Sequence, residues 1–255
     1  MSDKTHSKLG RRGFLQGFAA VTGAISLSSP SVAGDAPTAQ SDAAQIIRPA
    51  GTADAPSLPA PEAGYQSLGP DQVGFVEAMV NVMCPADSLT PSGVDCGLAI
   101  YIDRQLAGGF GKSERLYMRG PWKAGKPQHG YQLPLTPEQF FKAGVDAANE
   151  AAQRKFDRSF AELQPNEADA FLQDLAAGKI HDERLSLGSW FNELVYPLFV
   201  QACFSDPIYG GNVGKVFWRM IGYPGLPATH ADDMLQFRGK PYPAAQDPKT
   251  IADFS

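Results

Sequence analysis

Apolar side chains recur every three or four residues through the middle of the chain, the spacing of one face of an α-helix. The first run begins at Pro70, stops at Pro85 and contains Val73, Val76, Met79, Val80 and Met83. A second run follows Asp95, ends at Gly108-Gly109 and contains Leu98, Tyr101, Ile102, Gln105 and Leu106. Each run predicts a core helix, since a proline or a glycine pair terminates it.

Three further helices are predicted, two from their start signals and the fifth from its apolar side. Thr136-Pro137-Glu138-Gln139 has a cap, a first-turn proline and a capping-box glutamine, and its helix extends to about Phe156. Pro165-Asn166-Glu167 opens a helix that stops at Gly178. A fifth helix covers residues 187–204, and Pro197 predicts a kink within it.

The alternating pattern of β-strands is nearly absent from the sequence. We therefore predict an all-α, irregular helical domain of about five to seven helices, with long Gly/Pro-rich loops and an extended C-terminal tail. Residues 107–135 and 222–255 are too long and too rich in aromatics, glycine and proline for simple connections. They either wrap another subunit or fold back on their own core.

The first residues have the order of an export signal. Gly10-Arg11-Arg12-Gly13-Phe14-Leu15-Gln16 has the twin arginine, the aromatic and the leucine of a twin-arginine (Tat) signal. The weakly apolar residues 17–27 are too short to span a bilayer, and Ser31-Val32-Ala33 is a small-residue cleavage site. We expect export to the periplasm and cleavage after Ala33.

The composition divides the chain into four parts. The signal peptide covers residues 1–33, and residues 34–66, rich in Ala, Pro, Ser and Asp, are predicted to be a disordered linker. The helical domain covers residues 67–226, and residues 227–255 form the wrapping tail. After cleavage the chain has 18 basic and 26 acidic side chains, a formal charge of −8 that argues against nucleic acid as a partner. No other apolar run approaches 18 residues, so membrane contact is expected only through a partner or a peripheral surface.

The three cysteines are Cys84, Cys96 and Cys203. Cys84 and Cys96 are close in sequence and form the pair most easily bridged in an oxidising compartment; buried thiols are the alternative. None begins a C-x-x-C-H haem site.

Catalytic motifs are incomplete. Gly111-Lys112-Ser113 lacks the preceding P-loop glycine, and Glu114 stands where a dinucleotide fingerprint needs its third glycine. The three histidines after residue 33, His129, His181 and His230, are isolated, so no metal site is predicted. No catalytic, cofactor-binding or metal-binding residue is assigned.

Two rival classes remain open from the residues alone. The chain could be an independent periplasmic enzyme that uses the carboxylates of Asp87, Asp95 and Asp103, although turn and capping roles explain Asp87 and Asp95 more simply. It could also be a free-standing periplasmic binding or scaffold protein. Neither class explains why a helical protein without a cofactor has a twin-arginine signal.

Several turn-rich strings together resemble a known family. They begin with Cys84-Pro85-Ala86-Asp87 and Gly97-Leu98-Ala99-Ile100-Tyr101-Ile102-Asp103-Arg104, and continue with Gly120-Pro121-Trp122, Phe204-Ser205-Asp206-Pro207-Ile208-Tyr209-Gly210-Gly211-Asn212 and Trp218-Arg219-Met220-Ile221-Gly222-Tyr223-Pro224-Gly225. Over roughly residues 70–226 the chain resembles gluconate 2-dehydrogenase subunit 3, the small or gamma subunit of membrane-bound, FAD-dependent sugar and sugar-acid dehydrogenases.

The resemblance implies a three-part complex. Its large subunit is a flavoprotein of the glucose-methanol-choline type that contains FAD, and a multihaem cytochrome c subunit holds the complex at the membrane. The small subunit performs no redox step, and its signal exports the flavoprotein after FAD is loaded. Related complexes oxidise fructose, sorbitol or 2-ketogluconate. The family pattern has an Arg-Asp pair where this chain has Val213-Gly214-Lys215, which leaves the partner and its substrate open.

Aromatic side chains dominate protein interfaces, so four of them are the predicted anchors for the flavoprotein. They are Tyr117, Trp122, Tyr209 and Trp218. The alternative is that each belongs to the core of this chain. A tight turn from Asp206-Pro207 to Gly210-Gly211 is expected to place Tyr209 at the surface.

Overall fold

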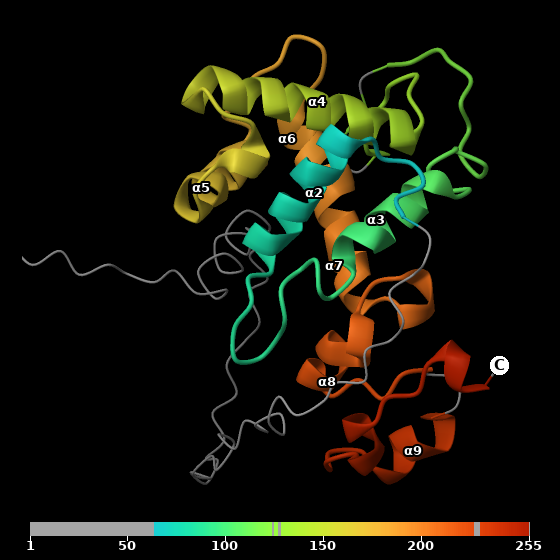
Figure 1. The fold of residues 1–255 in the computed structure, drawn as a ribbon. Coiled ribbons are helices and arrows are strands. Elements are labelled where there is room, and N and C mark those ends of the chain that lie inside the picture. The colour runs from blue at the N-terminus through green and yellow to red at the C-terminus, as the bar shows by residue number, and fades with distance from the viewer. Residues whose placement is uncertain (1–63, 124, 127–128, 227–229, 255) are drawn as a thin grey trace, which may run out of the picture. The chain divides into compact units, whose positions relative to one another are not determined.

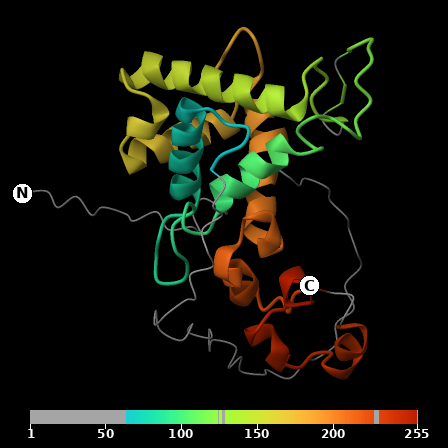
Figure 2. The same cartoon turned by 45° about the vertical axis from the view of Figure 1, so that its right-hand side comes forward.

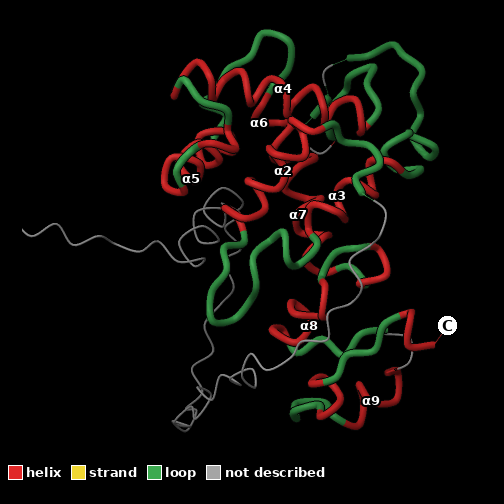
Figure 3. Tube along the Cα trace, in the orientation of Figure 1, coloured by secondary structure: helices red, strands yellow, loops and turns green. Residues whose placement is uncertain are grey.

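The computed structural model describes residues 64–254 except 124, 127–128 and 227–229 (Figure 1). The predicted signal, with Arg11, Arg12, Phe14, Leu15 and Ala33, and most of the predicted linker lie outside the described residues. Helices joined by long loops make up the described residues, which contain no β-strand (Figure 3). The all-α prediction is therefore confirmed.

The α-helices, with the labels of Figure 1, are α2 (Pro70–Met83), α3 (Leu98–Ala107), α4 (Pro137–Phe156), α5 (Pro165–Ala176), α6 (Leu187–Trp190), α7 (Tyr196–Phe204), α8 (Val216–Ile221) and α9 (Ala231–Gln236). Short 3₁₀ turns include η2 (Phe160–Glu162), η4 (Pro207–Tyr209), η5 (Val213–Lys215), η7 (Pro243–Gln246) and η8 (Ile251–Phe254). The sequence pattern did not indicate α8 and α9, because each has only about two turns and lacks a long apolar stripe.

Local signals fix the long helices where the sequence predicts them. The Thr136 hydroxyl accepts a hydrogen bond from the Gln139 amide at 3.3 Å, and the Gln139 side chain accepts one from the Thr136 amide at 2.9 Å. This reciprocal capping box satisfies two amides that have no partner within the helix. It starts α4 at Pro137, as the sequence predicts.

The fifth predicted helix differs from a simple kink. A π-helical segment, Phe191–Val195, joins α6 to α7 and ends two residues before Pro197. Proline has no amide hydrogen and its ring collides with the carbonyl four residues earlier, so a regular α-turn does not fit there. The wider π turn accommodates the proline and keeps one continuous helical column.

The core forms where this column meets the other helices. In Figures 1 and 2, α4 crosses the end of α2, and the column of α6 and α7 runs behind α2 and α3. Trp190 is fully buried, donates through Nε1 to the Phe141 carbonyl at 3.2 Å and lies against Gly144. Its ring centroid is 6.2 Å from that of Phe75. A Cβ atom at residue 144 would overlap the indole, so glycine is required there.

A buried carboxylate attaches the N-terminal segment to this core. Asp103 on α3 accepts hydrogen bonds from the amides of Gln66 at 2.7 Å, Ser67 at 2.9 Å and Leu68 at 2.9 Å. The Tyr65 hydroxyl donates to Glu77 on α2 at 2.6 Å. Contacts of the helical domain therefore begin at Tyr65, two residues before the predicted domain boundary.

The Ser67 hydroxyl adds a contact to α4 by donating to Glu138 at 2.7 Å. Lys112 and Lys142 also bond this carboxylate. Burial by itself raises the pKa of Glu138, but the bonds from Lys112, Lys142 and Ser67 outweigh it and lower the pKa to about 2. The ionised carboxylate thus ties together the N-terminal segment, α4 and the loop after α3.

Candidate partner interface

The three carboxylates of the enzyme hypothesis each bond within the fold. Asp87 accepts from the amides of Leu89 at 2.7 Å and Thr90 at 3.0 Å, which stabilises a turn. Asp95 accepts from the Ser92 hydroxyl at 2.7 Å in its own turn. Asp103 holds the N-terminal segment. The structure therefore gives each of the three a local or structural partner rather than a common site.

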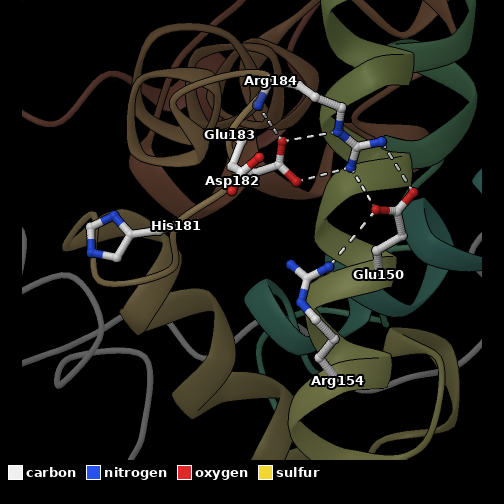
Figure 4. Close-up of a pocket in the computed structure, with 6 residues that line it drawn as sticks. All are labelled: Glu150, Arg154, His181, Asp182, Glu183 and Arg184. Carbon is white, nitrogen blue, oxygen red and sulfur yellow. Dashed lines mark hydrogen bonds and ion pairs between the residues drawn. The ribbon is translucent and has the colours of Figure 1, made fainter.

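A depression between α4 and the loop before α6 gathers charged side chains (Figure 4). Arg184 bonds Glu150 at 2.6 Å and Asp182 at 2.9 Å, and Arg154 lies 3.8 Å from Glu150. The hydrogen bonds from Arg184 lower the pKa of Asp182 to about 2. Figure 4 shows His181 pointing away from this network. The two arginines and Glu150 are each more than half exposed, and ion pairs between exposed side chains contribute little stability. The opposite charges of the network also neutralise one another.

The other histidines do not assemble a metal site. His230 Nδ1 lies 3.2 Å from Asp233 and 3.1 Å from the hydroxyl of Tyr242, and these contacts close a small local structure around α9. Among the described residues no three His, Cys, Asp or Glu side chains are placed to hold a metal ion.

Cys84 and Cys96 approach the same backbone atom. Their sulfur atoms lie 3.8 Å and 3.7 Å from the Pro91 carbonyl oxygen, and both side chains are buried. The hydrogen bond between the two thiols, with burial, raises the pKa of Cys96 far above its usual range. The structure brings the two predicted partners together, and the bridge itself stays a prediction.

The turn after α7 has a rigid frame that presents its apolar side chains to solvent. The Asp206 carboxylate caps η4 by accepting from the Ile208 amide at 3.0 Å. Asn212 is fully buried in the left-handed conformation, with φ of 49°. Its side chain donates to the Ser205 carbonyl at 3.2 Å and accepts from the Phe217 amide at 3.0 Å. Tyr209 therefore stands at the surface, 50% exposed.

Trp218 is buried beside this turn and bonds the end of α7. It is only 4% exposed, and its Nε1 donates to the Phe204 carbonyl at 2.8 Å. The Tyr223 ring packs edge-on against its indole, with 5.1 Å between centroids. Trp218 thus follows the core alternative of the sequence analysis rather than the anchor alternative, because bonds to α7 fix its indole inward.

The last residues of the tail fold back on the same chain. Asp206 accepts a second hydrogen bond, from the Ile251 amide at 2.9 Å, and Lys215 donates to the Pro248 carbonyl at 2.7 Å. A backbone bridge pairs Gly225 with Lys249. Lys215 belongs to the string that departs from the family pattern, and here it holds the tail. Sequence reasoning placed Asp206 in the turn that exposes Tyr209 but did not foresee its bond to the tail. It gave Asn212 and Lys215 no site role, although an Asn after two glycines is typical of a left-handed turn.

These segments leave a set of large apolar side chains in solvent, which we call the C-terminal apolar surface. Its members are Phe204, Ile208, Tyr209, Met220, Ile221, Ile251 and Phe254, all exposed by 39% or more. Such residues are common at protein interfaces. The other two predicted anchors lie on the loop between α3 and α4, where Tyr117 is 80% exposed and Trp122 is half-buried.

The described residues include no helix long and apolar enough to cross a bilayer. Exposed apolar side chains on a rigid frame, together with carboxylates engaged in the fold, are typical of a protein that works by association. The model of the gluconate 2-dehydrogenase subunit 3 family matches residues 70–225, which is more than half of the chain. The chain belongs to this family. Searches of curated proteins and of solved structures found no match.

Proposed function

We propose that this chain is the non-catalytic small subunit of a membrane-bound gluconate 2-dehydrogenase-type complex. It binds a glucose-methanol-choline-type flavoprotein in the cytoplasm, directs that partner through the twin-arginine pathway and stabilises it in the periplasm. FAD belongs to the flavoprotein and haem c to a multihaem cytochrome c subunit. The partner flavoprotein determines the substrate, either gluconate or a related acid or polyol such as 2-ketogluconate, fructose or sorbitol.

The family match over residues 70–225 carries this proposal, because a subunit acts within an assembly. The Arg11-Arg12 motif supports the export role, since the twin-arginine route accepts folded cargo. The arrangement of Asp87, Asp95 and Asp103 supports a role other than catalysis by this chain.

The C-terminal apolar surface is the proposed contact with the flavoprotein. Ile208 lies in the capped turn η4 and is 48% exposed, and Ile221 ends α8 and is 57% exposed. Both stand on backbone that hydrogen bonds hold in place, so docking needs little ordering of this chain. Pre-organisation of this kind raises affinity because less conformational entropy is lost on binding.

The export role is tested with an affinity tag inserted after Ala50, since a C-terminal tag would follow the apolar side chains of η8. Membranes are assayed for a co-purifying flavin, for haem and for gluconate oxidation with an artificial electron acceptor. Changing Arg11 and Arg12 to lysine should leave the flavoprotein in the cytoplasm. The matched control changes Lys4 and Lys8 to arginine and should export normally. Purification of this chain alone, without flavin or haem absorbance, would refute the proposal.

The interface is tested with Ile208→Asp and Ile221→Asp. A buried, unpaired carboxylate in an interface is strongly unfavourable, so each variant should lose at least tenfold in flavoprotein recovery while its own thermal unfolding is unchanged. Leu89→Asp is the matched control, because Leu89 is 46% exposed on a loop outside this surface. Equal recovery from all three variants would show that the C-terminal apolar surface is not the contact, without affecting the export proposal.

A further inference from the structure

The loop between α3 and α4 concentrates positive charge in an otherwise acidic chain. We call residues 112–123 the basic arm; it has four basic side chains and one acidic one. The rest of the chain after residue 33 has 14 basic and 25 acidic side chains. In Figures 1 and 2 the basic arm is part of the green loop that leaves the end of α3 and returns to the start of α4.

Most of this charge is exposed and available to a ligand. Lys112 bonds Glu138, but Arg115, Arg119 and Lys123 are exposed and form no ion pair with any described residue. Elsewhere, cations such as Arg184 and Lys155 bond neighbouring carboxylates. The three arm cations therefore add to one another in a local positive field.

Apolar side chains alternate with these cations. Leu116 and Tyr117, between Arg115 and Arg119, are 50% and 80% exposed. Trp122 is half-buried and precedes Lys123. In protein–protein interfaces, charged residues are depleted in the buried core and lie mainly at the rim. In the basic arm, cations and apolar side chains follow one another along the chain, so exposed charge accompanies the exposed apolar groups throughout the segment.

We propose that the basic arm binds the surface of an anionic phospholipid bilayer. Arginine and lysine side chains lie along lipid phosphates, while tyrosine and tryptophan rings occupy the headgroup level and leucine reaches the acyl boundary. The acidic remainder of the chain is repelled by the same surface, which orients the basic arm toward it. This contact goes beyond the partner-mediated attachment of the proposed function and does not depend on it.

Vesicle sedimentation tests this proposal with the exported form of the chain recovered from cells. We expect binding to phosphatidylglycerol-containing vesicles, loss of binding at high salt, and little binding to pure phosphatidylcholine. Changing Arg115, Arg119 and Lys123 to glutamine should lower the partition coefficient about a hundredfold, since each cation near an anionic surface contributes about fivefold. Equal affinity for both vesicle types would overturn the proposal.

A matched control removes the same charge elsewhere. Changing the exposed Lys179, Arg238 and Lys240 to glutamine alters the net charge equally but leaves the basic arm intact. This variant should bind anionic vesicles with an affinity close to that of the unaltered chain and far above that of the arm variant. If both triple variants lose affinity alike, the attraction is unspecific and the proposal fails.

Tryptophan fluorescence gives a second, local readout. Trp190 and Trp218 are buried, so Trp122 is the tryptophan placed to sense lipid. Anionic vesicles should shift its emission to shorter wavelength, and brominated lipids should quench it; Trp122→Phe should abolish both effects. If the arm variant instead loses the flavoprotein while the unaltered chain ignores vesicles, the basic arm is a protein contact and the lipid proposal is wrong.

Discussion

Replacing Asp103 with asparagine should detach the segment that connects the linker to the helical domain. The Asp103 carboxylate is buried, and its two oxygens accept three backbone amides from residues 66–68. An asparagine side chain has nearly the same shape but only one oxygen. Its amide nitrogen donates hydrogens, so it cannot accept from a backbone amide.

The size of this effect depends on which of the three hydrogen bonds the asparagine can keep. In the better orientation the asparagine oxygen replaces Oδ1 and keeps the bonds to Ser67 and Leu68, each 2.9 Å in the structure. The bond from the Gln66 amide to Oδ2, 2.7 Å, is lost. A hydrogen bond to a charged group contributes about 1.5–3 kcal/mol, so opening of this segment should become about 10- to 150-fold more frequent.

Hydrogen exchange of the amides of residues 66–68 measures this opening directly, and urea denaturation measures the global free energy of unfolding. Asp71→Asn is the control, because it removes the same charge at an exposed residue in the first turn of α2 that does not bond the amides of residues 66–68. Unchanged protection of the three amides in Asp103→Asn, with correct folding, would refute the reasoning.

Three further predictions concern the pH dependence of stability, the packing of two glycines and the pairing of two cysteines. Because the pKa of Glu138 is depressed to about 2, the ionised carboxylate stabilises the folded state fully above its ordinary pKa near 4.5, and this stabilisation is lost as pH falls toward 2. Glu138→Gln should therefore flatten the pH dependence of the free energy of unfolding in this range. Gly144→Ala should destabilise the domain by about 1–3 kcal/mol in urea unfolding, since the new methyl overlaps the core indole. Gly74→Ala in α2 should instead stabilise it by up to ~1 kcal/mol, since the new methyl would only touch Ala161 at an ordinary contact distance of 3.9 Å. Peptide mapping of the exported chain without reductant should recover Cys84 and Cys96 as one linked pair; separate alkylation of both would count against the bridge.

The sequence by itself determined the long helices, because their signals are local. The capping box at Thr136 and the proline at Pro165 each act within a few residues, and the structure starts α4 and α5 there. The family could also be identified from turn-rich strings, since their glycines and prolines constrain the backbone directly.

Only the tertiary structure decided what these residues do. Asp103 meets amides 35 to 37 positions away, and Asp206 meets the Ile251 amide 45 positions away. Helical spacing carries no information about such distant partners. For the same reason the aromatic residues Tyr209 and Trp218, equivalent as interface candidates in the sequence, separate into an exposed side chain and a buried one. The bond from the Trp218 indole to the Phe204 carbonyl, which exists only after α8 packs on α7, makes that difference.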